Sequence, residues 1–82
     1  MAHDPVEISW TGGAASGVLR DFSRSGLRAE LEDAIKIGTE ARISVRGQEL
    51  RAVVRSCVRA ASGHLVGVEF DTEDCGKLKR IR

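Results

Sequence analysis

Apolar side chains recur at every second position in several short segments, and this alternation constrains the fold more than any other feature of the chain. Val6, Ile8 and Trp10 alternate with Glu7 and Ser9, and three later segments repeat the pattern. A period of two places alternate side chains on opposite faces of a strand, so each segment is expected to be a strand with one buried face. The later segments are 27–31, 41–45 and 66–70.

Turn-forming residues separate these segments. Gly12 and Gly13 follow the first one, and residues 18–22 are placed to pair back on it as a hairpin. Gly47 and Gly63 mark two further turns. The pattern therefore predicts a run of antiparallel strands and an all-β fold. The residues expected to lie mostly inside are Val6, Ile8, Val18, Leu27, Leu31, Ile43, Val45, Val54, Val66, Val68 and Phe70.

Residues 49–61 fit two different structures. Their apolar side chains fall at i, i+3, i+4 and i+7, the spacing of an amphipathic helix, and periodicity alone favours that structure. However, several of them are valines, whose branched side chains suit a strand, and Gly47 and Gly63 are spaced to flank a hairpin. We therefore interpret the segment as a strand. Its apolar residues are Leu50, Val53, Val54, Cys57, Val58 and Ala61.

The chain is short and nearly neutral. Its 82 residues, 41% of them hydrophobic and 30% charged, predict one globular domain spanning 1–82 with a net charge of only +1. It lacks the roughly 18 consecutive apolar residues of a membrane span and the features of a signal peptide, so we expect a cytoplasmic protein. Cys57 and Cys75 have neither disulfide nor zinc-site spacing. No metal or other cofactor is expected.

The C-terminal segment orders its charges in a way that favours a helix. Acidic residues come first from Asp71 and basic residues come last, which complements a helix dipole, and Asp71 is the candidate N-cap. A short C-terminal helix is predicted, although Gly76 interrupts it. Cys75, Leu78 and Ile81 are spaced three apart and are the residues expected to face inward.

Motifs for catalysis are absent from the sequence. It contains no GxSxG, HExxH or phosphate-binding glycine loop, and His3 and His64 have no partner at a catalytic spacing. The prediction is that the chain is not an enzyme.

The segment 20–26, Arg-Asp-Phe-Ser-Arg-Ser-Gly, has two interpretations. In the structural one, Asp21 and Ser23 bond to local backbone and Gly26 supplies a positive φ, which makes a turn. In the functional one, the Asp21 carboxylate accepts N–H donors from the Watson–Crick edge of a guanine, while Arg20 and Arg24 bind guanine or phosphate. The residues alone favour the turn without excluding a binding site.

The same segment resembles a known motif. Residues 21–26 match the [DN]xSxxG motif of PilZ domains, and the order of segments through 67–70, Gly-Val-Glu-Phe, is similar to that family over about residues 18–81. The resemblance implies a six-stranded antiparallel β-barrel with a short C-terminal helix. It also implies a non-enzymatic bacterial regulatory module that binds cyclic di-GMP. The ligand-binding residues would be Asp21, Ser23 and Gly26, with Arg20 and Arg24 as helpers.

The chain departs from the family at its N-terminal end. Nucleotide-binding PilZ domains carry an RxxxR motif ahead of the first strand, whereas residues 1–19 contain no Arg or Lys. Arg20 and Arg24 have that spacing but straddle the second motif. The alternative function is therefore a PilZ-like adaptor that has lost the nucleotide and acts through contacts with a protein partner.

A basic stripe is the last feature of the sequence. In a regular strand, Arg51, Arg55 and Arg59 would share one face with Val53 and Cys57. We interpret this as a solvated face, partly neutralised by glutamates such as Glu40, Glu49 and Glu69. Nucleic acid is not the expected partner, because aromatic residues, which would stack on bases, make up only 4% of the chain.

Overall fold

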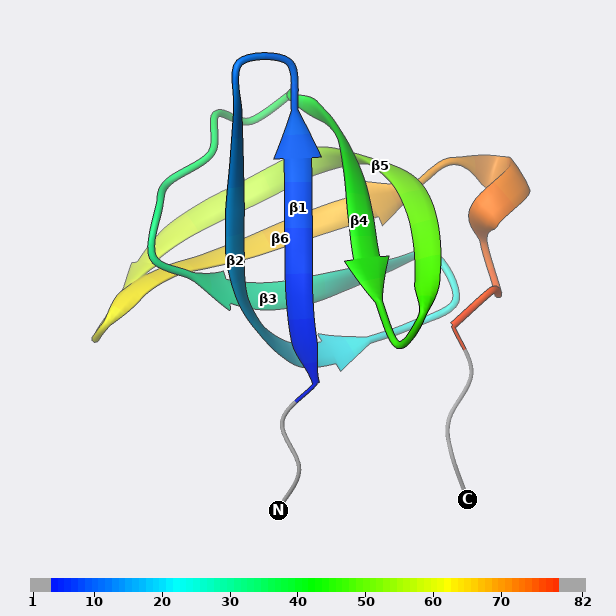
Figure 1. The fold of residues 1–82 in the computed structure, drawn as a ribbon, viewed down its shortest axis with the longest axis horizontal. Coiled ribbons are helices and arrows are strands. Elements are labelled where there is room, and N and C mark those ends of the chain that lie inside the picture. Colours follow the sequence, from blue (N-terminus) through cyan, green and yellow to red (C-terminus); the bar gives the residue numbers. More distant parts are fainter. Residues whose placement is uncertain (1–3, 79–82) are drawn as a thin grey trace.

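The chain forms a closed antiparallel β-barrel of six strands (Figure 1). The structure is a computed structural model and describes residues 4–78. The elements are β1 (Pro5–Trp10), β2 (Gly13–Phe22), β3 (Gly26–Leu31), β4 (Glu40–Val45), β5 (Gln48–Ala60), β6 (Gly63–Phe70) and the 3₁₀ turn η1 (Thr72–Asp74). Around the barrel the order is β1-β2-β3-β6-β5-β4, and pairing of β1 with β4 closes it. The all-β fold and the barrel are confirmed.

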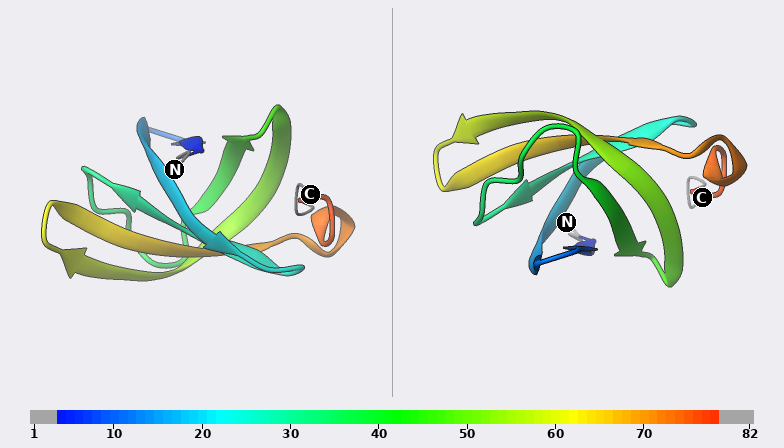
Figure 2. Two further views of the ribbon diagram at one scale, coloured as in Figure 1. Left: turned by 90° about the horizontal axis from the view of Figure 1, so that it is seen from below. Right: turned by 90° about the horizontal axis from the view of Figure 1, so that it is seen from above.

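The strands curve around one apolar core, with η1 beside them (Figure 2). Nearly all the residues expected inside are buried, because the alternation carries them inward from every strand except β2. Ile43, Leu50 and Val54 are fully enclosed, at 0% exposure. The interior of so small a barrel is therefore filled by side chains.

Val18 is the exception, since it is only half-buried. Its neighbour Gly17 pairs with the buried Val6 and Leu31, so Gly17 is the inward position and Val18 points outward. A Cβ on Gly17 would lie 1.9 Å from the carbonyl oxygen of Glu30, a close approach that only glycine permits. The prediction that Val18 lies inside was wrong because a glycine occupies the inward position.

Residues 48–60 form one long strand, so the strand interpretation of this segment is confirmed. Leu50 pairs with Ile43 and Val54 pairs with Val68, but Arg55 has no partner because β5 has a bulge between Val54 and Ser56. The bulge adds one residue, so Val54 and Cys57, three apart, both face inward. This spacing explains why the apolar residues of the segment also fit the periodicity of a helix.

The same bulge divides the predicted basic stripe. Arg51 and Arg55 lie on the outer face, but beyond the bulge Cys57 pairs with the buried Val66 and packs on the core. Arg59, two residues later, therefore belongs to the inward phase of the strand, at its exposed end. The prediction that these arginines share one face with Cys57 was wrong, because it assumed an unbroken alternation.

The C-terminal helix is reduced to a single 3₁₀ turn, η1. Asp71 makes no capping hydrogen bond with its side chain, and Gly76 adopts a φ of 82°, which a continuing helix would not allow. Leu78 is buried and Cys75 is half-buried, as expected, while Ile81 lies outside the described residues.

Asp74 anchors this turn to the barrel. Its carboxylate accepts the backbone N–H of Arg51 at 2.7 Å and pairs with the Lys77 ammonium at 2.6 Å. First the backbone N–H and then the Lys77 hydrogen bond lower the pKa of Asp74. The buried Asp74 carboxylate, bonded to these partners, holds the end of the chain against β5.

Replacing Asp74 should reveal this anchor in the pH dependence of stability. Because the folded-state pKa is lowered, the contribution of Asp74 is fully present above its ordinary pKa of 3.8 and is lost as the pH falls below that value. Asp74→Asn should therefore lower the Tm at pH 7, and its difference from the parent should shrink in acid. Thermal unfolding followed by circular dichroism between pH 7 and pH 3 measures this. Glu73→Gln, an exposed neighbour in the same turn, is the control.

A pair of substitutions in β5 separates the strand from the helical alternative. Leu50→Ala should cost about 2–5 kcal/mol of the free energy of unfolding, since it leaves a cavity in the core. Val58→Ala should change it by less than about 0.5 kcal/mol, because Val58 is 59% exposed. Urea unfolding measures both. Equal losses would mean that Val58 is buried as a helix would require, contrary to this barrel.

Candidate functional site

The loop between β2 and β3 is held by hydrogen bonds within itself and to its surroundings. Ser23 donates its backbone N–H to the carbonyl of Gly26 at 2.8 Å, and the Ser25 N–H lies 3.4 Å from the Ser23 hydroxyl. The Ser25 carbonyl accepts the N–H of Phe70, and the Arg24 carbonyl accepts that of Gly76, each at 2.8 Å. The loop is therefore fixed against the end of β6 and the C-terminal segment.

Gly26 is required by packing rather than by a left-handed backbone. It is not among the residues with positive φ. Instead, a Cβ at this position would lie 2.2 Å from the carbonyl oxygen of Val68 on β6. The interpretation of Gly26 as a positive-φ turn residue was wrong, because its role is to let β3 approach β6 closely.

Asp21 forms an ion pair across the first two strands of the site. It lies opposite Arg28 in the register of β2 and β3, and both carboxylate oxygens accept hydrogen bonds from that guanidinium, one of them from Nε at 3.0 Å. These hydrogen bonds lower the pKa of Asp21 and raise that of Arg28. The Asp21 side chain is 51% exposed, so solvent or a ligand can reach the charge.

An open groove of about 640 Å³ runs beside this pair. It is lined from β2, β3, β5 and β6, and on the far side Arg55 pairs with Glu69 at 2.8 Å. Between the two ion pairs lies Gly67, where a Cβ would be 2.4 Å from the Ser56 hydroxyl oxygen. The floor of the groove is therefore formed by Gly67 and the Ser56 hydroxyl that lies over it, with one ion pair on each side.

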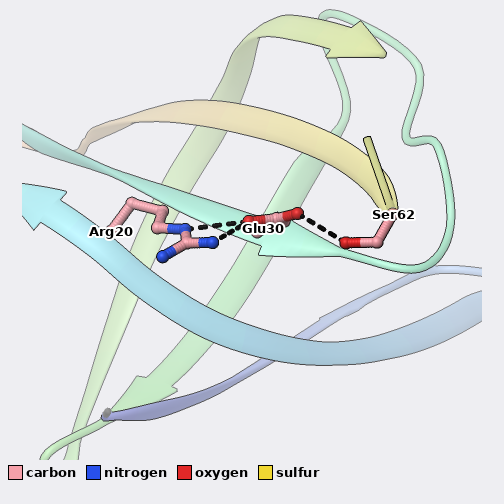
Figure 3. A network of polar contacts seen from close by, with 3 residues as sticks. All are labelled: Arg20, Glu30 and Ser62. Atoms are coloured by element: carbon pink, nitrogen blue, oxygen red, sulfur yellow. Dashed lines mark hydrogen bonds and ion pairs between the residues drawn. The ribbon is translucent and has the colours of Figure 1, made fainter. Parts of the chain in front are cut away.

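Arg20 and Arg24, the two other candidate residues, do not line this groove. Arg20 occupies the bulge of β2 and bonds to Glu30, which also accepts from the Ser62 hydroxyl at 3.0 Å (Figure 3). This network ties β2 and β3 to the turn after β5 and lowers the pKa of Glu30. The Arg24 guanidinium lies near Gly76, with Nη1 3.3 Å from where a Cβ would be.

The groove contains residues that sequence reasoning did not assign to a site. Arg28 was one polar position in an alternating strand, and Arg55 was part of the basic stripe. Only the strand register shows that Arg28 faces Asp21, and only the bulge shows that Arg55 stands beside Gly67. The 67–70 segment did carry a signal for Gly67 and Glu69, but as a family feature rather than as groove lining.

Two negative findings apply to the described part of the chain. Residues 4–78 contain no cluster of three or more His, Cys, Asp or Glu side chains that could hold a metal ion. Within the same range, no helix is long and apolar enough to cross a membrane.

The fold and the groove define a small β-barrel domain with an open groove on its surface. A family model of the PilZ domain matches residues 2–81, which is nearly the whole chain. The chain belongs to the PilZ domain family, a family of cyclic di-GMP-binding regulatory modules that act without catalysis. Among curated proteins, none matches this chain.

Proposed function

We propose that this PilZ domain is a cyclic di-GMP receptor that binds the nucleotide at the loop between β2 and β3. The observation that carries the proposal is the position of Asp21, a half-exposed carboxylate at the edge of an open groove, within an intact DxSxxG segment. Family membership supplies the ligand class. The domain would act by binding rather than by catalysis, in the cytoplasm, where its unpaired Cys57 and Cys75 thiols would stay reduced.

The chemistry of Asp21 suits a guanine edge. The N1–H and N2–H donors of guanine are parallel, and a carboxylate can accept both. To do so, Asp21 must give up Arg28, but an exposed ion pair stabilises a protein by only about 0–1 kcal/mol. A hydrogen bond to a charged group contributes roughly 1.5–3 kcal/mol, so the exchange is favourable. Ser23 lines the same groove as Asp21. Arg20 and Arg24 remain predicted to assist in binding the nucleotide.

The second candidate function is an adaptor that no longer binds the nucleotide. The observation that favours it is the absence of Arg and Lys from residues 1–19. Nucleotide-binding PilZ domains carry the RxxxR motif in this N-terminal region. In this case the loop would be a structural element, and a protein partner would carry the signal.

Replacing Asp21 tests the receptor. Asp21→Ala should weaken cyclic di-GMP binding at least tenfold in titration calorimetry, because a charge-assisted hydrogen bond is worth roughly 1.5–3 kcal/mol and about 1.4 kcal/mol is tenfold. Its Tm should change little, since the Arg28 pair is exposed. Asp33→Ala, which removes an exposed carboxylate outside the groove, should bind like the parent. No heat from the parent would contradict the receptor proposal.

Supplying the missing arginines distinguishes the two functions further. A variant with an Arg-x-x-x-Arg extension ahead of Val6 should gain or tighten cyclic di-GMP binding to the micromolar range, because the new guanidinium groups add charge-assisted hydrogen bonds to the ligand. The matched control carries Gln in place of both added arginines. If neither the parent nor the variant with the added arginines binds cyclic di-GMP, the loop no longer recognises the nucleotide and the adaptor proposal stands alone.

A further inference from the structure

Two ion pairs face each other across the groove, and each carries a guanidinium that a ligand can reach. Asp21 and Arg28 come from β2 and β3, while Glu69 and Arg55 come from β6 and β5. Every member of the two pairs is more than half exposed at its side chain, between 51% and 61%. The charges cancel within each pair, so the groove is formally neutral while it is empty.

The register explains how these four side chains come to surround Gly67. Arg28 lies opposite Gly67 across the β3–β6 ladder, and Gly26 lies opposite Glu69 one step along it. Glycines therefore occupy two diagonal corners of this surface, and the charged residues occupy the other two. The bulge then places Arg55 next to the floor on β5. The Ser56 hydroxyl lies over Gly67, so the floor presents a small polar group with a guanidinium on either side.

Neither arginine is saturated by its present partner. Arg55 donates to Glu69 through Nε, and this is its one side-chain hydrogen bond among residues 4–78. Arg28 uses Nε and Nη2 on Asp21, which leaves Nη1. A guanidinium has five N–H donors, so each arginine can bind an anion even before it releases its carboxylate.

The geometry points to Arg28 and Arg55 as the phosphate-binding groups of this site, one on each side of Gly67 and Ser56. This inference rests on the proposed function, because its ligand is the cyclic dinucleotide, which carries two phosphates. The barrel itself would then provide guanidinium groups that residues 1–19 lack. Glu69 competes with phosphate for Arg55, so its charge limits the affinity of the groove.

The experiment measures cyclic di-GMP binding by titration calorimetry at low ionic strength, where exposed charges are least screened. Arg28→Gln and Arg55→Gln should each weaken binding at least tenfold. Glu69→Gln should tighten it about threefold to tenfold, because it removes the competing carboxylate. The double variant Arg55→Gln/Glu69→Gln should bind like Arg55→Gln alone, since Glu69 acts only through Arg55.

A matched control comes from the same strand. Arg59→Gln removes an exposed arginine of β5 that lies beyond the bulge and outside the groove lining, so it should bind like the parent. Arg55→Lys keeps the positive charge but loses the forked N–H donors of the guanidinium. Its binding should therefore lie between that of the parent and that of Arg55→Gln. A melting curve for each variant checks that it is folded.

The outcomes separate this inference from the function on which it rests. If the parent binds and Asp21→Ala weakens it, but the Arg28 and Arg55 variants bind like the parent, only the phosphate assignment is overturned. If the parent and Glu69→Gln both give no heat, the receptor and this inference fail together. If only Glu69→Gln binds, the receptor proposal is contradicted for the parent, while the phosphate assignment stands because removal of the competing carboxylate restores binding.

Discussion

Closure of the sheet is the constraint on which the rest of the structure depends. β1 must pair with β2 on one side and β4 on the other, so that Val6 meets Gly17 and Val45, and Ile8 meets Ile43. A closed barrel has no unpaired edge, and its interior must be filled by the inward residue of every strand. Because the interior is full, any ligand has to bind on the outside, where charged side chains and glycines decide the chemistry.

β2 and β5 each contain a bulge, and an arginine occupies each of the two bulges. Arg20 leaves the β2–β3 ladder just before Asp21, and Arg55 leaves the β5–β6 ladder just before Ser56. A bulge turns the following residues to the other face. This is how Asp21 comes to face Arg28, and how Arg55 comes to stand beside the groove floor. The site is thus a consequence of two local irregularities in an otherwise regular barrel.

These irregularities also mark the limit of what could be predicted from the sequence. Strict alternation in 27–31 and 41–45 was sufficient to place Leu27, Leu31, Ile43 and Val45 inside. No local sequence signal marks the bulge at Arg55, so the predicted basic stripe was assumed to continue past this residue. Likewise, charge order predicted a helix after Asp71, but buried Leu78 and the positive φ of Gly76 fold the segment back on the barrel after one turn.

The DxSxxG segment itself can be divided by what each residue does for the fold. Gly26 is required for packing against Val68, and Ser23 forms the turn through its backbone and hydroxyl groups, so both have a structural reason to be present. Asp21 does not, because its one partner, Arg28, is an exposed cation and such a pair contributes only about 0–1 kcal/mol. Asp21 is therefore the residue of this segment whose presence points to a ligand. An aspartate with little structural role, at the edge of an open groove that also contains Arg28 and Arg55, is better explained by recognition than by stability.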